Sequence, residues 1–265
     1  MNNNFDDVIE IDKIKTLLAE SVHKPGFSSV VVGCSGGIDS TTSLYLAEKA
    51  LGKDAIIPLL LPYKDVHSTH IQDAKEALST IGIEEKQMRI IDIAPSVDHI
   101  AQALGIDVHS RDPRYTLRLG NIMARTRMIA LFDMAKASDA LVLGTENKSE
   151  HFLGYYTRFG DEASDIEPLR HLYKTEVYRI AKKLNVPDSI LKKAPTAALW
   201  PGQTDEKELG FTYEDADKIL YKSIDQHKTA QEIIAEGMSK ELVSKVLDRV
   251  NSVSFKHTLP LTIEE

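Results

Sequence analysis

"VVVGCSGGIDSTTSLYLAEK", from Val30 to Lys49, decides the fold and poses the functional question. Its apolar start is typical of a buried strand, its glycine-rich centre of a tight turn, and its end of a helix. The central GCSGG fits the Gly-x-Ser-x-Gly turn of hydrolases, in which Ser35 would attack an acyl group. Continued through Asp39 and Ser40, the same stretch fits a loop that binds a phosphate.

The surroundings favour the phosphate interpretation. No His-Gly-Gly-Gly segment precedes the turn to supply an oxyanion donor, and the strand is the first of the sheet, which is unusual for a hydrolase nucleophile. Gly36 and Gly37 allow backbone N–H groups to approach an anion, and the following helix adds its positive end. The loop lacks the Gly-Lys-Ser/Thr ending of a Walker A motif. Asp39 fits a Mg²⁺ ligand between phosphates, although Asp39 and Ser40 could instead only cap the helix.

The composition narrows the class of protein. The 265 residues carry a formal charge of -8, which disfavours wholesale binding of nucleic acid. A single cysteine excludes an internal disulfide and fits a reducing compartment. The start "MNNNFDDVIEIDKI" lacks the features of a signal peptide, and the longest apolar run, at 55–62, is too short for a membrane span. We expect a cytoplasmic protein with no membrane association.

Short apolar runs alternate with segments of helical period, and this alternation predicts a doubly wound parallel α/β sheet. The runs are nearly all apolar, as in strands covered on both faces. After Leu172 only helical patterns follow, so we expect one domain over 1–265 with a helical C-terminal part. The predicted strands are 28–34, 55–61, 89–93 and 140–144; the predicted helices include 41–51, 70–81, 114–136, 174–185, 213–222, 229–236 and 239–253.

Ligands of such sheets bind at the carboxyl ends of the strands. Two polar loops, 33–40 and 144–150, leave predicted strands and would open onto one crevice if those strands are neighbours. The first loop resembles the Ser-Gly-Gly-x-Asp-Ser loop of the N-type ATP pyrophosphatases, which include GMP, asparagine, argininosuccinate and NAD synthetases. This loop alone does not choose among them.

"LGTENKSEHFLGYYTRFGD", residues 143–161, resembles the signature of the NAD synthetases. "GNIMARTRM" from Gly120, "PLRHLYKTEVYRIAKKL" from Pro168 and "PTAALWPGQTDEKELG" from Pro195 are similar to the same family in the same order. The resemblance implies an adenine-nucleotide α-hydrolase-like fold and a ligase that forms a C–N bond. The implied reaction amidates nicotinic acid adenine dinucleotide (deamido-NAD) with ammonia through an acyl-adenylate, and it consumes ATP with Mg²⁺.

The resemblance also assigns site residues. Asp39, Glu150 and Lys174 are implied as catalytic, the first two as Mg²⁺ ligands. Without the resemblance, Glu150 would be explained by a favourable interaction with the dipole of its helix. Arg125 would be explained as part of a polar helix face in contact with solvent. The implied ATP contacts are Gly33, Cys34, Ser35, Gly36, Gly37, Ile38, Asp39, Ser40, Thr145, Lys174 and Thr196. The implied deamido-NAD contacts are Arg125, Arg158, Asp165 and Lys256.

Some features depart from the family pattern. Glu162 stands where members commonly have glycine, and Lys256 lies in Phe255-Lys256-His257 where many have His-Lys-Arg. The segment before Val30 is too short for the amidase domain of glutamine-dependent members, so ammonia is the expected nitrogen donor, and the family implies a homodimer. The segment 195–210 has no apolar period; we expect a lid-like loop there, with Trp200 exposed. A GMP synthetase-like enzyme and a non-catalytic nucleotide-binding regulator stay as alternatives.

Overall fold

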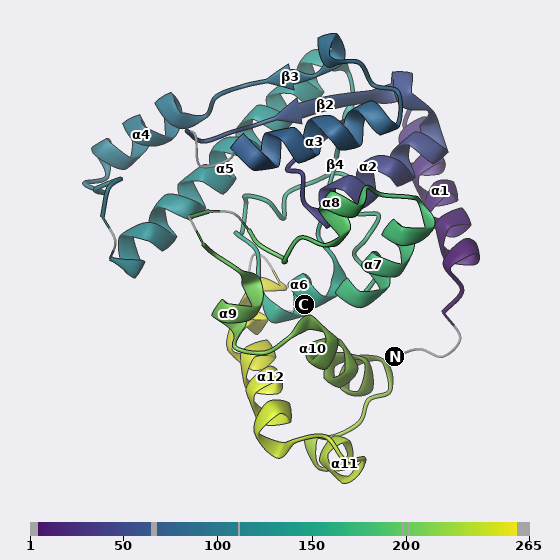
Figure 1. Cartoon of the computed structure of the whole chain (residues 1–265), viewed down its shortest axis with the longest axis vertical. Coiled ribbons are helices and arrows are strands. Elements are labelled where there is room, and N and C mark those ends of the chain that lie inside the picture. Colours follow the sequence, from purple (N-terminus) through teal and green to yellow (C-terminus); the bar gives the residue numbers. More distant parts are fainter. Residues whose placement is uncertain (1–4, 65–67, 111, 198, 201, 259–265) are drawn as a thin grey trace, which may run out of the picture.

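The fold is built on a parallel sheet whose strands follow the predicted runs (Figure 1). The computed structural model describes residues 5–64, 68–110, 112–197, 199–200 and 202–258. The strand order is β3-β2-β1-β4, and every pairing is parallel. The strands are β1 Val30–Gly33, β2 Ile56–Leu60, β3 Arg89–Ile90 and β4 Leu141–Leu143.

Helices cover both faces of the sheet, which confirms the doubly wound prediction. Val30 and Val32 of β1 pack with one group of helices, whereas Val31 between them packs with the other. This alternation follows from the two-residue period of a strand. The first group is α1 Asp7–His23, α2 Ile38–Leu51, α3 Ser68–Thr80 and α7 Lys174–Lys183; the second is α4 Ala94–Ala103 and α5 Pro113–Ser138.

One strand does not fit the expectation of burial on both faces. Arg89 and Ile90 of β3 are exposed, because β3 lies at the edge of the sheet. It is also shorter than the predicted 89–93, since the chain turns into α4 soon after Ile90. The prediction of full coverage is therefore wrong for this strand, and correct for the central strand β1, whose Val30, Val31 and Val32 are buried.

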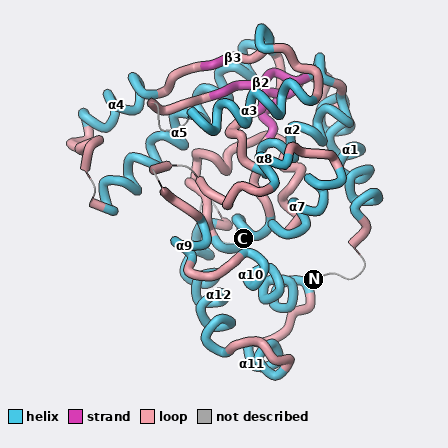
Figure 2. The backbone as a smooth tube through the Cα atoms, in the orientation of Figure 1, coloured by secondary structure: helices cyan, strands magenta, loops and turns pink. Residues whose placement is uncertain are grey.

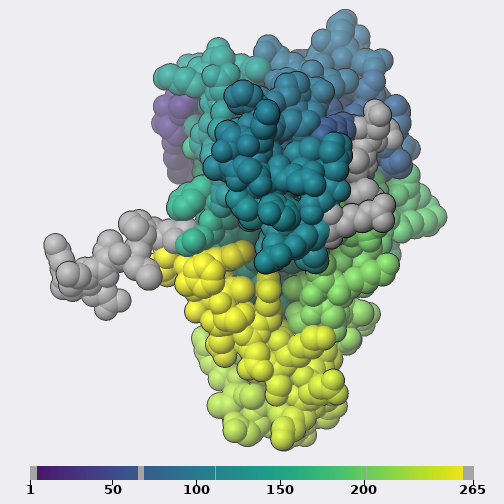
Figure 3. Space-filling model, turned by 90° about the vertical axis from the view of Figure 1, so that its left-hand side faces the viewer, coloured from purple at the N-terminus to yellow at the C-terminus, as the bar shows by residue number. Residues whose placement is uncertain are grey.

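The C-terminal part is helical, as predicted (Figure 2). It has its own apolar core. This core includes Leu153, Tyr213, Ile219 and Val246. In the space-filling view these helices form a lobe below the sheet (Figure 3). The helices after β4, apart from α7, are α6 Lys148–Leu153, α8 Asp188–Leu191, α9 Asp205–Leu209, α10 Tyr213–Leu220, α11 Ala230–Ala235 and α12 Lys240–Val253. Three shorter helical turns and a π-turn at Tyr221–Asp225 complete the described helices.

The strand order reverses between β1 and β4, and this reversal positions the site. The chain runs outward from β1 to β2 and β3, then returns to place β4 on the other side of β1. The loops after β1 and β4 therefore leave neighbouring strands at the same edge, where open α/β sheets bind ligands. We predicted that loops 33–40 and 144–150 open onto one crevice if their strands are neighbours. β1 and β4 are neighbours, so this condition is met.

Among the described residues, α5, with 26 residues, is the longest helix, and neither it nor any other helix has the length and apolar content of a membrane span.

Gly154 provides a test of how the C-terminal lobe packs. It ends α6 at a φ of 59°, and an added Cβ would lie 2.6 Å from the Val253 side chain of α12. Gly105 has a similar φ of 65° but nothing within 4 Å of such an atom. We expect Gly154→Ala to lower the free energy of unfolding by about 1–3 kcal/mol more than Gly105→Ala, because overpacking adds to backbone strain. Equal losses in denaturant titrations would show that α6 and α12 are not in tight contact.

Candidate active site

The loop after β1 is shaped to bring backbone N–H groups to a ligand. Gly36 has a φ of 72°, and a Cβ there would lie 2.3 Å from the backbone oxygen of His70 in α3, so only glycine fits. Gly37 is the N-cap of α2 and, as a glycine, has no side chain to cap the helix. The first N–H groups of α2 are thus left without a side-chain acceptor, which suits an anion. Gly33 and Ile38 bound this loop at the end of β1 and the start of α2.

The two serines of the loop hold each other. Ser35 Oγ lies 2.8 Å from Ser40 Oγ and accepts a hydrogen bond from Gly37 N at 3.2 Å. Ser40 also donates to the Gly37 carbonyl. These contacts tie Ser35 to its own loop, and the geometry gives no support to a hydrolase nucleophile. Cys34 is buried, and burial raises the pKa of its thiol to about 12, so it packs rather than reacts.

Lys174 joins the two loops of the crevice. Its side chain is only 2% exposed, and its Nζ lies 2.5 Å from Asp39 Oδ2 and 2.9 Å from Glu150 Oε1. Asp39 comes from α2, Glu150 from α6 and Lys174 from the first residue of α7. The structure therefore brings together the three residues predicted as catalytic. Asp39 does not merely cap α2, because its carboxylate is turned to Lys174 and to Asn147.

The charges of this cluster are strongly coupled. Burial alone would lower the pKa of Lys174, but the carboxylates of Asp39 and Glu150 hold it well above its usual value. Burial and the neighbouring Asp39 raise the pKa of Glu150. Lys174 therefore stays an ammonium, shared by two carboxylates. The pair of carboxylates is only partly neutralised and would attract a further cation.

A second layer of polar residues fixes the loop after β4. Asn147 donates from Nδ2 to Asp39 Oδ1 at 2.9 Å and caps α6 by accepting from Glu150 N at 3.0 Å. Ser149 accepts from Lys174 N at 2.8 Å and donates to the Asp217 carboxylate. The sequence patterns did not single out Asn147 or Ser149. Their position inside the "GTENKSE" stretch was the only signal that could have found them.

Asp217, from α10, connects this layer to the C-terminal lobe. Its side chain is 1% exposed and accepts from the Ser149 hydroxyl, from Thr175 N at 2.9 Å and from Thr175 Oγ1 at 2.7 Å. One buried carboxylate thus holds the starts of both α6 and α7, which carry Glu150 and Lys174. No local sequence pattern marked it.

The described residues of the segment 195–210 have more regular structure than predicted. It contains helix α9, and Asp205 of that helix accepts from Ala197 N at 3.0 Å while its own N donates to the Pro195 carbonyl. These two hydrogen bonds fix the backbone of the residues on either side of Thr196, which is part-buried. Trp200 is half-buried, not exposed as expected. Asp205 also accepts from Tyr213 OH, whose ring lies 5.1 Å from Lys174 Nζ, so the segment is connected to the central cluster.

The residues present fit a Mg²⁺ ion that arrives with phosphates. Among the described residues, no group of three or more His, Cys, Asp or Glu side chains forms a ready metal cage. Asp39 and Glu150 nevertheless offer two carboxylates around one cation. Mg²⁺ is usually held by one or two carboxylates together with substrate phosphates. The part-buried Thr145 lies at the start of the same loop.

Of the four residues assigned to deamido-NAD, Arg125, Asp165 and Lys256 bond through their side chains to backbone atoms. Arg125 Nε donates to the Arg158 carbonyl at 3.2 Å, and the Arg158 guanidinium lies over the Phe255 ring. Asp165 Oδ2 accepts from Val142 N at 2.7 Å. Lys256 Nζ donates to the carbonyls of Gly154 and Tyr156. The structure brings Arg125 and Arg158 together and places Lys256 at the end of α6.

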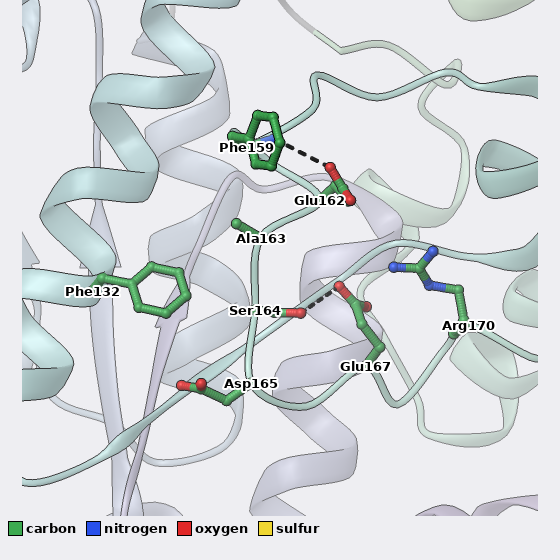
Figure 4. A pocket seen from close by; sticks show the side chains of 8 residues that line it. All are labelled: Phe132, Phe159, Glu162, Ala163, Ser164, Asp165, Glu167 and Arg170. Carbon is green, nitrogen blue, oxygen red and sulfur yellow. Dashed lines mark hydrogen bonds between the residues drawn. The ribbon is translucent and has the colours of Figure 1, made fainter. Parts of the chain in front are cut away.

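A cavity of about 500 Å³ lies beside Asp165 (Figure 4). Glu162, the departure from the expected glycine, accepts from Phe159 N at 3.2 Å and so stabilises the turn, in which Phe159 has a φ of 58°. Figure 4 shows Glu167 between Ser164 and Arg170 on one wall. The lining residues are Phe132, Phe159, Glu162, Ala163, Ser164, Asp165, Glu167 and Arg170.

Known proteins resemble the chain over nearly its whole length. The sequence model of the family described as NAD synthase matches residues 10–260. The NH(3)-dependent NAD(+) synthetase of Fusobacterium nucleatum subsp. nucleatum is 38% identical over 94% of this chain and 93% of its own. The solved NMN synthetase from Francisella tularensis has a TM-score of 0.83, 32% identity and coverage of 99% and 100% of the two chains. The solved NH3-dependent NAD synthetase from Campylobacter jejuni subsp. jejuni has a TM-score of 0.79, 29% identity and coverage of 98% and 100%.

We expect Asp217→Asn to lower the free energy of unfolding by about 2–3 kcal/mol, because an amide N–H would face the buried donors of Thr175. Turnover should fall with it, since α6 and α7 lose their common anchor. Glu214→Gln, on the exposed side of α10, is the control and should stay within about 0.5 kcal/mol of the parent. Unchanged denaturation midpoints and rates for Asp217→Asn would contradict the anchoring role.

Proposed function

The chain belongs to the NAD synthase family, and from this membership we propose that it is a ligase that makes NAD from deamido-NAD, ATP and ammonia. The observation that carries the proposal is the Lys174 ammonium held between Asp39 and Glu150, next to an anion-binding loop at the strand-order reversal. We treat residues 1–265 as one NAD synthetase domain, with the C-terminal helices as a part of it.

In the first half-reaction, the nicotinate carboxylate attacks the α-phosphorus of ATP, and pyrophosphate leaves. The N–H groups at the start of α2, with the hydroxyls of Ser35 and Ser40, would bind the phosphates. The Lys174 ammonium would stabilise the negative charge that develops on the leaving pyrophosphate. Asp39 and Glu150 would hold Mg²⁺, which when bound screens the phosphate charge and orients the pyrophosphate. In the second half-reaction ammonia displaces AMP from the acyl-adenylate.

The remaining assigned contacts are part of the proposal. Cys34, Gly33, Thr145 and Thr196 would line the ATP site, and Arg125, Arg158, Asp165 and Lys256 the deamido-NAD site. Substrate would have to replace the backbone partners that the side chains of Arg125, Asp165 and Lys256 now hold. A homodimer is supported by apolar side chains exposed on α5, Leu117 at 56% and Ile129 at 59%. The cytoplasmic location stays a prediction.

Ammonia is the proposed nitrogen donor because the Fusobacterium and Campylobacter proteins, matched over nearly their whole lengths, are both named as dependent on it. The Francisella protein is named for a smaller product, NMN, and its similarity raises a second candidate substrate, the nicotinate mononucleotide. Both candidates share the amidation chemistry and differ in whether an adenylate portion is recognised. A GMP synthetase-like activity and a non-catalytic role have less support, because the chain belongs to the NAD synthase family and keeps Asp39, Glu150 and Lys174 together.

The direct test supplies the purified chain with ATP, Mg²⁺, deamido-NAD and ammonium and measures NAD and AMP. We expect equal amounts of the two products, and no NAD when ammonia-free glutamine replaces ammonium. Nicotinate mononucleotide in place of deamido-NAD should give a much lower kcat/KM. Comparable rates with glutamine would contradict the assignment of the nitrogen donor, and a preference for the mononucleotide would contradict the assignment of the substrate.

We expect Asp39→Asn and Glu150→Gln each to abolish turnover, because each removes a negative charge from the cation site and keeps the size of the side chain. Circular dichroism should show an intact fold. Asp188→Asn is the matched control, since Asp188 forms an exposed ion pair with Lys192 far from the cluster. Activity near that of the parent in either site variant, at millimolar Mg²⁺, would rule out the proposed metal ligands.

A further inference from the structure

Glu146 is a buried carboxylate to which the assigned roles give no function. It lies between Thr145 and Asn147 in the loop after β4, and it is 4% exposed. Its oxygens have no well-aligned hydrogen bond, and its one close cationic partner is Arg170, 3.1 Å from Oε2. A buried carboxylate without well-aligned donors is costly, so its retention requires an explanation.

The groups around Glu146 leave one of its oxygens facing an acceptor. Arg170 Nη2 lies 3.1 Å from Oε2, and Arg170 Nη1 contacts His151 Nδ1. Because a guanidinium only donates, His151 Nδ1 must accept, and it has no proton for Glu146 Oε1, 3.5 Å away. Burial and Arg170 lower the pKa of His151 to about 4, which agrees with a neutral ring. Oε1 therefore lacks a donor.

A second carboxylate belongs to the same cluster. Glu167 accepts from Ser164 Oγ at 2.7 Å and from Glu146 N at 3.1 Å, and it lines the cavity of about 500 Å³ (Figure 4). Gly144 leaves room for it, since a Cβ there would lie 2.0 Å from Glu167 Oε1. Two carboxylates thus face one guanidinium and a neutral imidazole. Burial raises the pKa of both Glu146 and Glu167 to about 8, so the cluster has the acceptors for one more small cation, whose charge would favour the ionised carboxylates.

We propose that Glu146 and Glu167, with the Ser164 hydroxyl, bind the ammonium ion that supplies the nitrogen of the product. This inference rests on the proposed function. Ammonium carries four N–H donors and no acceptor, so it matches a cluster of carboxylate and hydroxyl oxygens. Arg170 and His151 then hold Glu146 in place, and Ser164 and Glu167, which line the cavity, are the ligands that the ion would reach from it. The alternative is that Glu146 and Arg170 form only a structural ion pair.

Glu146 of this cluster belongs to the same loop that contacts the phosphate-binding loop. Glu146 directly precedes Asn147, whose amide is bonded to Asp39. Glu146 Oε1 takes one proton from ammonium: an N–H bond breaks and an O–H bond forms. The freed lone pair of ammonia forms the C–N bond at the acyl-adenylate, and AMP leaves with the electrons of the C–O bond. The second proton lost from nitrogen goes to AMP or solvent. Burial raises the pKa of Glu146 to about 8, so its ionised form, which a bound cation favours, is a stronger base toward ammonium than an ordinary carboxylate.

The test compares ammonium with hydroxylamine, a nucleophile that is uncharged at neutral pH. We expect Glu146→Gln to raise the apparent KM for ammonium about tenfold or more, with the KM for hydroxylamine changed by less than about twofold. Exchange of labelled pyrophosphate into ATP, which needs deamido-NAD but no ammonium, should keep its parental rate. Glu167→Gln should shift the ammonium KM in the same direction, so a second variant tests the site if the first is unstable. Ionic strength is held constant with choline chloride.

Asp188→Asn is the control, because it removes a negative charge from an exposed ion pair with Lys192 and contacts neither Glu146 nor Glu167. Its ammonium KM should equal that of the parent. An unchanged ammonium KM in Glu146→Gln, or an equal rise for hydroxylamine, would overturn the ammonium site and leave the structural ion pair. Absence of pyrophosphate exchange in the parent would instead overturn the proposed function and this inference with it.

Discussion

The buried ammonium of Lys174 is the interaction on which the arrangement of the crevice depends. A charge that is 2% exposed is tolerable only when it is paired and hydrogen-bonded, and its partners come from segments far apart in the sequence. Asp39 is 135 residues from Lys174 and Glu150 is 24 residues from it. Removing Lys174 would leave two buried carboxylates uncompensated, and its ammonium needs acceptors from both loops, so the loop after β1, the loop after β4 and the start of α7 must be in register. The same pairing prepares the site electrostatically for phosphates and a metal, since the cation and both carboxylates are already in position.

The C-terminal lobe takes part in this arrangement and is not a separate appendage. Asp217 of α10 holds Ser149 and Thr175, and Tyr213 of the same helix lies against Lys174 and bonds to Asp205. Through these contacts, Asp217 holds the starts of α6 and α7, and Tyr213 packs against the Lys174 ammonium. A rigid group of this kind keeps functional side chains in position before substrate arrives, which is how preorganised sites reduce reorganisation during reaction.

Much of the sheet could be predicted from the sequence, because the buried strands are apolar runs and the turn after β1 needs glycines. What could not be predicted depends on tertiary contact. Helices α1 and α4 were not predicted, since each presents only a narrow set of buried residues, such as Ile14, Leu18 and Val22 in α1. The exposure of β3 follows from the strand order, which no local pattern encodes. The need for glycine at position 36 was predicted from its freedom of φ. The fold adds a second reason, since a Cβ there would clash with the backbone of His70. Asp217 and Glu146 looked like ordinary charged residues, because only the folded chain buries them.

The loop after β4 shows how one short segment could serve both reactants. Asn147 has an extended backbone, with φ −100° and ψ 170°, and neighbouring side chains of an extended chain point to opposite sides. Asn147 accordingly reaches Asp39 and the phosphate loop, whereas Glu146 lies against Arg170 and His151. If ammonium binds at Glu146, the nucleophile and the activated carboxylate approach from the two sides of the same strand of backbone. Two like-charged cations, Lys174 and ammonium, are then kept apart, each with its own pair of carboxylates. This separation is what an amidating ligase requires, because a shared set of carboxylates would let Lys174 exclude the ion that must react.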